Sequence, residues 1–162
     1  MSLSYSAVSK ITIRTVLGLV ILISFAGKGL NVKGFEQEIK TLLLPVIGFT
    51  ENYFFERQTI YKFIFAFSLS MAWSILASEL LIGLMLILDY KAKTAAVFLM
   101  GLLCMFSAVL IVNILYPSPE LKTCGCFGAL WEEPLSWWSV IRNGVLMGLS
   151  WAVYRAEAEK EA

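Results

Sequence analysis

Histidine is absent from this chain of 162 residues. Histidine is the commonest metal ligand and the side chain whose unperturbed pKa lies nearest neutral pH. Its absence excludes most metalloenzymes and most hydrolases that use a histidine as general base. Charge is also scarce, because only 15% of the residues are charged and the formal net charge is +1. So small a net charge gives no reason to expect binding to nucleic acid.

Apolar residues, in contrast, make up 59% of the chain, and the mean hydropathy is +0.76. Soluble domains have roughly half apolar residues and about a quarter charged ones. Four apolar stretches are each long enough for a membrane-spanning helix, which needs about 20 residues. The sequence therefore predicts one all-α membrane domain over residues 1–162, a bundle of four transmembrane helices. The predicted spans lie near Ile11–Leu30, Phe63–Leu88, Ala92–Tyr116 and Leu135–Tyr154.

The first predicted span has some features of a secretory signal, because Lys10 and Arg14 precede its apolar run. Since the sequence begins with Met1, we expect this segment to remain as the first helix. Four spans place both termini on one face of the membrane. The basic pair Lys91 and Lys93 favours cytoplasmic termini, because positive residues prefer that face. The remaining basic residues are divided almost evenly between the two faces.

The longest connection, about Asn31 to Lys62, mixes charged and apolar residues. We predict an interfacial amphipathic helix from Gly34 to about Leu44. We expect Pro45 and Gly48 to prevent the apolar block around them from becoming a fifth span. The apolar residues that recur at helical spacing are Phe35, Ile39, Leu42 and Leu43.

The loop between the third and fourth predicted spans, residues 117–134, contains Cys124-Gly125-Cys126. Two thiols in a solvent-facing loop can form a disulfide or exchange one with a partner. Gly125 supplies the backbone freedom that so tight a ring needs. The alternative is a static disulfide that only pins the loop. A metal site is the weaker interpretation because it needs about four ligands, and Cys104, inside the third span, is expected to behave as an apolar residue.

Apart from Lys93 at the very start of the third span, four charged residues fall within the predicted spans, and such residues usually face a partner or a cavity because burying charge in lipid is costly. Glu79 lies deepest; we expect it to form an ion pair with Arg14 or to carry protons. Lys28 and Arg142 lie on the face of the cysteine loop, and Asn113 is at a similar depth. Cations there would lower the pKa of a thiol, or bind a quinone or a small carboxylate. Snorkelling to the interface is the alternative for each long side chain.

Several of these elements together resemble the MauE/DoxX family of redox-associated membrane proteins. The resemblance covers nearly the whole chain, and the Cys-Gly-Cys-Phe-Gly element is its most specific part. It implies a four-helix bundle in a bacterial cytoplasmic membrane that supports thiol–disulfide chemistry of periplasmic, often thioredoxin-like, partners. The elements are Arg14 with Gly18, Gly27-Lys28, Glu79-Leu80-Leu81-Ile82-Gly83, Cys124-Gly125-Cys126-Phe127-Gly128 and Arg142-Asn143.

Two functions of different classes follow. The first is a thiol–disulfide oxidoreductase component in which Cys124 and Cys126 exchange electrons with a separate thioredoxin-like protein outside the cytoplasm. The second is a non-catalytic subunit or assembly factor of a larger membrane complex, in which the disulfide is structural. No metal is expected, and a quinone is the one cofactor that the cationic residues would suit. The supporting polar site of the first hypothesis consists of Lys28, Asn113, Arg142, Glu79 and Arg14.

Overall fold

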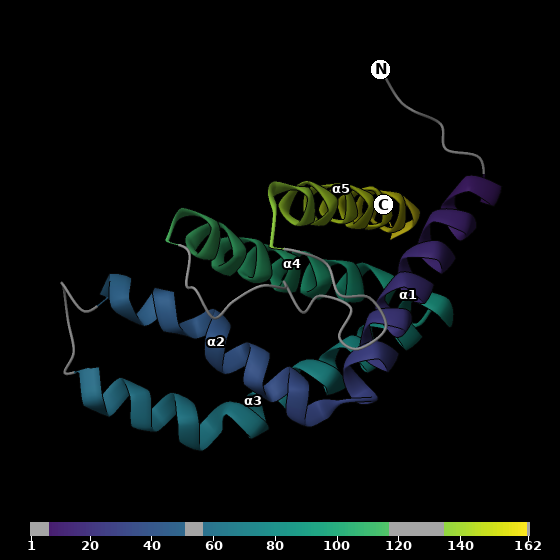
Figure 1. Ribbon diagram of the computed structural model, residues 1–162. Helices are drawn as coiled ribbons and strands as arrows, with labels where there is room; N and C mark the ends of the chain where they lie inside the picture. Colours follow the sequence, from purple (N-terminus) through teal and green to yellow (C-terminus); the bar gives the residue numbers. More distant parts are fainter. Residues whose placement is uncertain (1–6, 51–56, 117–134, 162) are drawn as a thin grey trace.

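The computed structural model describes residues 7–50, 57–116 and 135–161. Over these ranges the chain forms five helices and no strand (Figure 1). The all-α class predicted from the sequence is therefore confirmed. The helices are α1 (Ala7–Gly29), α2 (Val32–Thr50), α3 (Arg57–Ile87), α4 (Ala92–Leu115) and α5 (Trp137–Glu161).

Among the described residues, three segments are long and apolar enough to cross a membrane: Ile11–Gly29, Lys62–Ile87 and Ala92–Leu115. Each agrees with a predicted span to within one residue at either end. The fourth predicted span coincides with most of α5, but α5 is not among the candidate spans. Its charged and polar residues, together with three tryptophans, lower its hydropathy. The count of four spans therefore remains a prediction.

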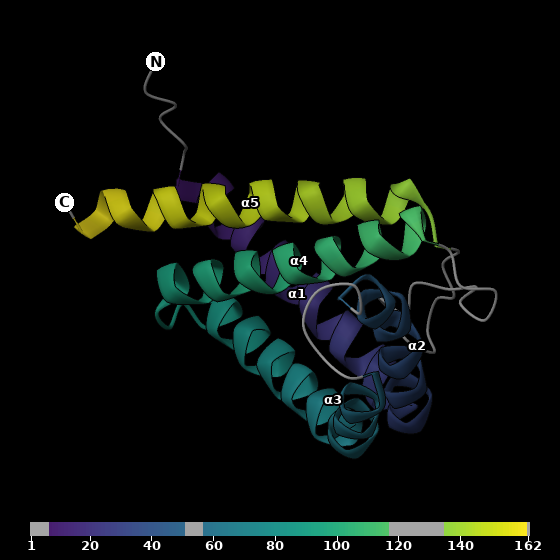
Figure 2. The same ribbon diagram turned by 90° about the vertical axis from the view of Figure 1, so that its left-hand side faces the viewer.

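The helices run back and forth between two ends of the bundle. Helix α1 packs mainly against α3, and α4 packs mainly against α5. Figure 2 shows α4 and α5 side by side in opposite directions, while α3 diverges from α4 beyond the short turn that joins them. The start of α1, the α3–α4 turn and the end of α5 lie at one end, which we call the terminal end. The end of α1, helix α2 and the start of α5 lie at the other, which we call the loop end.

The main core lies where α1, α3, α4 and α5 meet. Small residues allow close packing there: Ala95 and Ala96 of α4 are fully buried, and Gly18 of α1 faces Gly83 of α3. Close helix approach through small residues is typical of membrane bundles, where lipid removes the usual hydrophobic drive for helices to associate. The buried apolar residues of this core are Leu17, Ile21, Ile82, Leu86, Ala95, Ala96, Leu99, Leu103 and Val153.

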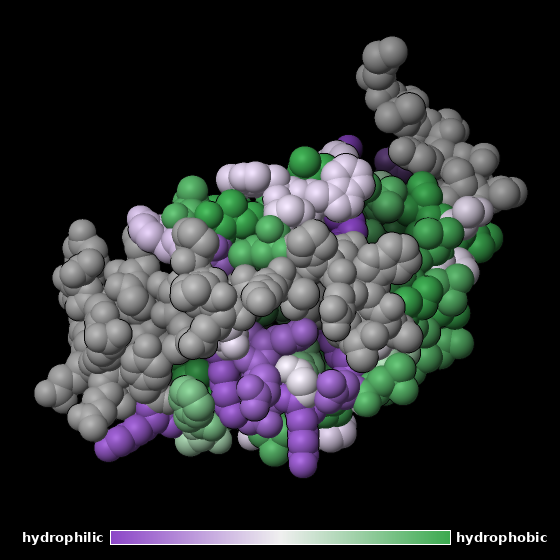
Figure 3. Space-filling view, viewed as in Figure 1, coloured by the Kyte–Doolittle hydropathy of each residue, from purple (hydrophilic) through white to green (hydrophobic). Residues whose placement is uncertain are grey.

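Helix α2 begins near its predicted start but extends to Thr50. The prediction that this helix ends near Leu44 is therefore wrong, although α2 is not among the candidate spans of the described residues. A proline inside a helix removes one backbone hydrogen bond, and here the turns before it are held by packing against α3 and α4. Figure 3 shows hydrophilic surface gathered over the region of α2, flanked by apolar surface. Its interfacial position in the membrane remains a prediction.

Candidate functional site

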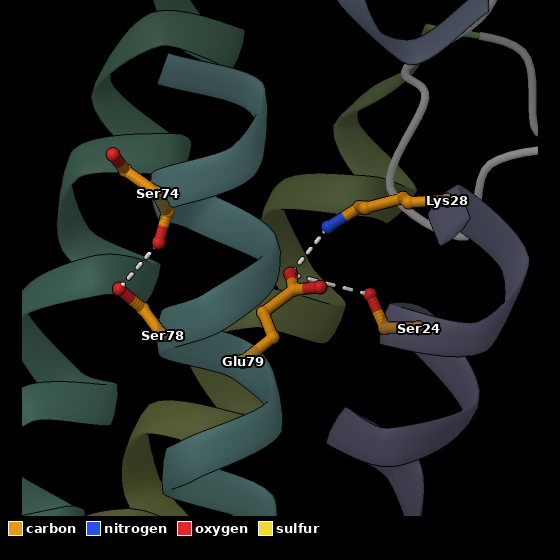
Figure 4. Close-up of polar contacts among 5 residues, drawn as sticks. All are labelled: Ser24, Lys28, Ser74, Ser78 and Glu79. Atoms are coloured by element: carbon orange, nitrogen blue, oxygen red, sulfur yellow. Dashed lines mark hydrogen bonds and ion pairs between the residues drawn. The ribbon is translucent and has the colours of Figure 1, made fainter. Parts of the chain in front are cut away.

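Lys28 and Glu79 form an ion pair in the interior of the bundle, between α1 and α3. Lys28 is 2% exposed and Glu79 is 4% exposed. The hydroxyl of Ser24 donates to Oε1 of Glu79 at 3.4 Å, the same oxygen that receives the Lys28 ammonium (Figure 4). Ser24 and Lys28 are four residues apart, so both lie on the face of α1 that meets α3. Two donors from one helix thus converge on one carboxylate oxygen of the next.

Lys28 is surrounded by aromatic rings as well as by the carboxylate. Its Nζ lies 5.2 Å from the ring centroid of Phe35 on α2 and 5.2 Å from that of Phe106 on α4. A cation over an aromatic face is stabilised by the ring quadrupole, and more strongly where water is excluded. The ammonium is therefore held inside the protein by contacts from α2, α3 and α4, and the snorkelling interpretation does not apply to Lys28.

The expected ion pair between Arg14 and Glu79 is wrong. Arg14 instead pairs with Asp89 in the α3–α4 turn, and its Nη1 lies 4.0 Å from Oε1 of Glu157 on α5. Arg14 and Lys28 are separated by about 21 Å along α1, at 1.5 Å per residue. Because α1 and α3 run in opposite directions, Glu79 falls beside the Lys28 end of α1. Arg14 therefore belongs to a second charged cluster, at the terminal end.

A small cavity of about 40 Å³ lies beside the Lys28–Glu79 pair. A water molecule needs roughly 10–15 Å³ of such space, so the cavity admits only a few waters. Oε2 of Glu79 is buried without a hydrogen-bond partner among the described residues. An unsatisfied buried acceptor is costly, so this oxygen is suited to accept a hydrogen bond from a further donor in the cavity. Its polar lining is Ser24, Lys28, Glu79, Arg142 and Asn143, and its apolar lining is Val20, Ile21, Leu102, Leu103, Phe106 and Leu146.

The structure brings three of the predicted supporting residues together, because Lys28, Glu79 and Arg142 all line this cavity. Asn113 has a different place. It is fully buried, and its Nδ2 donates to the carbonyl oxygens of Leu42 and Val109, both at 2.8 Å. Asn113 thus ties α4 to α2 and does not line the cavity.

The predicted catalytic residues, Cys124 and Cys126, lie outside the described residues. Helix α4 ends at Leu115 before them and α5 begins at Trp137 after them. Among the described residues, no group of three or more Cys, Asp or Glu side chains is arranged to hold a metal ion. Cys104, on α4, is exposed on the outside of the bundle.

Sequence reasoning did not select Ser24, Phe106 or Asn143 as members of the site. Ser24 was detectable in principle, because it precedes Lys28 by four residues and so shares its helix face. Asn143 follows Arg142 directly, but the sequence does not show how α5 is rotated, and this rotation brings both residues to the cavity. Phe106 is one of 11 phenylalanines, and nothing in the sequence distinguishes it from those that face outward.

A second hollow, which we call the α3–α4 groove, lies between the diverging faces of α3 and α4. Its volume is about 380 Å³. Figure 4 shows that Ser74 and Ser78 lie on the side of α3 away from Lys28, and both line the groove. Leu102 lines the groove and the cavity alike. The other lining residues are Ile75, Ile82, Val97, Phe98, Gly101 and Met105.

A polar cluster joins α2, which is not a candidate span, to Ser68 within the candidate span of α3. Lys40 pairs with Glu36 at 2.6 Å, and the hydroxyl of Ser68 donates to Oε1 of Glu36 at 2.8 Å. The hydrogen bond from Lys40, followed by that from Ser68, lowers the pKa of the Glu36 carboxyl below its ordinary value.

Comparison with known proteins gives two matches. The family described as "Methylamine utilisation protein MauE" matches residues 5–156. A relative from Paracoccus denitrificans, "Methylamine utilization protein MauE", is 36% identical over 75 residues. That match covers 46% of this chain and 40% of the relative, so it spans less than half of that protein. No solved structure matches the chain.

Proposed function

Because the chain belongs to the MauE family and is a multi-pass membrane protein, we propose that it is an accessory component for thiol–disulfide exchange. Its partner would be a separate thioredoxin-like protein outside the cytoplasm, and Cys124 and Cys126 would be the reacting residues. The observation that supports the proposal is the cavity lined by Lys28, Glu79 and Arg142, to which the last turn of α1 and the second turn of α5 contribute. Helix α4 ends before the Cys-Gly-Cys segment of the sequence and α5 begins after it, and the end of α4 and the start of α5 lie at the loop end.

The exchange conserves electrons and protons between the two proteins. A thiolate of the partner attacks one sulfur of the Cys124–Cys126 disulfide and forms a mixed disulfide, and the partner's second thiolate then displaces it. The partner loses two electrons and two protons, and Cys124 and Cys126 leave as thiols. Cationic groups near the loop favour the thiolate, and Arg142 is the residue that we expect to do so.

A trapping experiment tests this proposal. A Cys126→Ser variant retains a single thiol, Cys124, which can attack the disulfide of the oxidised partner in the reverse of this exchange. Because no second cysteine of the loop can then displace the partner, the mixed disulfide should accumulate and survive non-reducing electrophoresis. Mass spectrometry of the trapped species should identify one protein with a thioredoxin-like Cys-X-X-Cys pair. The matched control is the Cys124→Ser/Cys126→Ser double variant, which retains Cys104 alone and should trap nothing. If Cys126→Ser and Cys124→Ser both trap no specific protein, the proposal is wrong.

A structural subunit of a larger membrane complex is the second candidate function. The observation that favours it is the α3–α4 groove, whose outward face carries Phe98 and Met105 among other exposed apolar residues. A structural subunit would co-purify with its complex in both single-cysteine variants and would trap no mixed disulfide. Co-purification without trapping would therefore favour this second function over the first.

A further inference from the structure

We propose that the α3–α4 groove and the Lys28–Glu79 cavity together form the binding site of a membrane quinone. The apolar tail would lie in the groove, and the ring would reach the ion pair past Leu102. The binding site is inferred from the groove, the cavity and Leu102 between them. Electron transfer to the quinone, in contrast, depends on the proposed function.

The polar half of the site has groups that match both redox forms of a quinone. An ammonium has three N–H donors and no acceptor, so Lys28 suits the carbonyl oxygens of the oxidised form. Oε2 of Glu79 is a buried acceptor with no donor among the described residues, so it suits the hydroxyl of the reduced form. Water alone would satisfy Glu79 in the unliganded protein. The pair can therefore bind the ring before and after reduction.

The apolar half suits a hydrocarbon chain because its polar atoms are already satisfied. The hydroxyl of Ser74 donates to the carbonyl oxygen of Ser70 at 2.8 Å, and the hydroxyl of Ser78 donates to the carbonyl oxygen of Ser74 at 2.7 Å. Gly101 has no atom within 4 Å of the position that a Cβ would occupy, so the groove floor is open there. A volume of about 380 Å³ lies within the range of roughly 300–1,000 Å³ that is usual for small-molecule sites.

Leu102 separates the two halves. Its half-buried side chain lines both hollows, with the groove on its outer side. The cavity of about 40 Å³ holds water but not a ring. The ring therefore reaches Lys28 only if the Leu102 side chain changes rotamer and moves into the groove. Because the groove on the outer side of Leu102 is open, it offers space for the displaced side chain.

A quinone at this site would complete the redox cycle of the proposed function. After exchange with the partner, Cys124 and Cys126 are thiols and need an oxidant before they can act again. The dithiol and a quinone give a disulfide and a quinol. Two electrons and two protons pass from the thiols to the ring, so the step is balanced.

Binding is tested with the full chain in lipid nanodiscs, with decylubiquinone as the probe and empty nanodiscs to subtract partitioning. Decylbenzene, which has the tail but no carbonyl oxygen, and oleate, which has an anionic head, are the comparison ligands. We expect wild-type protein to bind decylubiquinone in preference to both. Leu102→Trp should weaken binding by about tenfold or more, because the larger ring fills the passage. Glu79→Gln should weaken quinol binding by about tenfold, the usual effect of losing one hydrogen bond to a charged group.

The matched control is Leu84→Trp, the same substitution at a lipid-exposed leucine of α3 that lines neither hollow. It should bind as wild type does. Equal binding of decylubiquinone and decylbenzene, displacement by oleate, or wild-type affinity in Leu102→Trp would each overturn the inference. The Cys124→Ser/Cys126→Ser variant should still bind the quinone. If the partner is trapped but no quinone binds, the proposed function is supported and the quinone site is wrong. If quinone binds but no partner is trapped, the quinone site is supported and the proposed function is wrong.

Discussion

Gly18 of α1 and Gly83 of α3 meet where the two helices cross. A Cβ on Gly18 would lie 3.1 Å from the carbonyl oxygen of Gly83, and a Cβ on Gly83 would lie 3.3 Å from that of Gly18. Such contacts leave no room for a side chain on either helix. The crossing fixes how far α1 is shifted along α3, and this shift places Glu79 beside Lys28.

Substitution at the crossing should therefore lower stability. In Gly83→Ala the new Cβ would lie 2.7 Å from Cδ2 and 2.8 Å from Cγ of Leu22, so the Leu22 side chain or the backbone of α1 must shift. We expect thermal unfolding in detergent to show a loss of about 1–3 kcal/mol, as is usual for overpacking. The control is Gly144→Ala, where the new Cβ meets nothing within 4 Å. That variant should be unchanged or slightly more stable, because alanine favours helix; equal effects of the two substitutions would contradict the tight crossing.

The Lys28–Glu79 pair should behave as one unit in a double-mutant cycle. Lys28→Met or Glu79→Met alone leaves one buried charge without its counter-ion, which costs about 3–5 kcal/mol. The double variant should recover most of this loss, measured as accumulation in membranes and as thermal unfolding. Arg14→Met and Glu79→Met should instead combine additively, because these residues belong to separate clusters. Strong coupling of Glu79 to Arg14 would argue against the register of α1 on α3.

Labelling of the cysteine loop tests the predicted orientation. A membrane-impermeant thiol reagent should modify Cys124 and Cys126 in reduced cells whose outer membrane alone has been opened. The Cys124→Ser/Cys126→Ser variant should remain unlabelled, because Cys104 lies within a candidate span. Labelling that requires lysis of the cytoplasmic membrane would place the loop inside, where disulfides are rare.

The reduction potential of the Cys124–Cys126 pair should lie in the range of exchange proteins, roughly −270 to −120 mV. Arg142→Gln should shift it to more negative values, because loss of a nearby cation destabilises the thiolate and so the reduced form. Titration of purified protein against glutathione buffers, read by thiol alkylation, measures this directly. A reduction potential below about −300 mV that is the same in wild type and in Arg142→Gln would indicate a structural disulfide.

The Glu36 cluster should make stability depend on pH in the acid range. Its carboxyl has a lowered pKa in the folded protein, so its stabilising contribution is complete above the ordinary value of 4.5 and is lost as pH falls through the folded value. Glu36→Gln should therefore differ from wild type at neutral pH and converge with it in acid, measured by thermal unfolding. Gln37→Ala, an exposed neighbour, should differ from wild type by the same amount at every pH.

Hydropathy located three spans almost to the residue, because a bilayer requires an unbroken apolar run of fixed length. Hydropathy does not predict which charged residues form ion pairs. The ion-pair partner of Glu79 depends on the contact between Gly18 and Gly83, which are far apart in the sequence. Sequence alone therefore predicts Arg14 as this partner in place of Lys28. Asn113 was assigned to the polar site on depth alone, whereas the carbonyl oxygen of Leu42 on α2 binds it. Helix α2 continues past Pro45 because tertiary packing outweighs a local signal.

The surroundings of Lys28 also set an order of events during synthesis. Glu79 follows Lys28 by 51 residues, and Phe106 is made later still. When α1 enters the bilayer, its charged end therefore has neither of these partners, and the Lys28 side chain is expected to reach the interface. It is expected to turn inward only after α3 emerges and supplies the carboxylate. In a chain truncated before Glu79, the Lys28 amine should consequently remain open to a membrane-impermeant reagent.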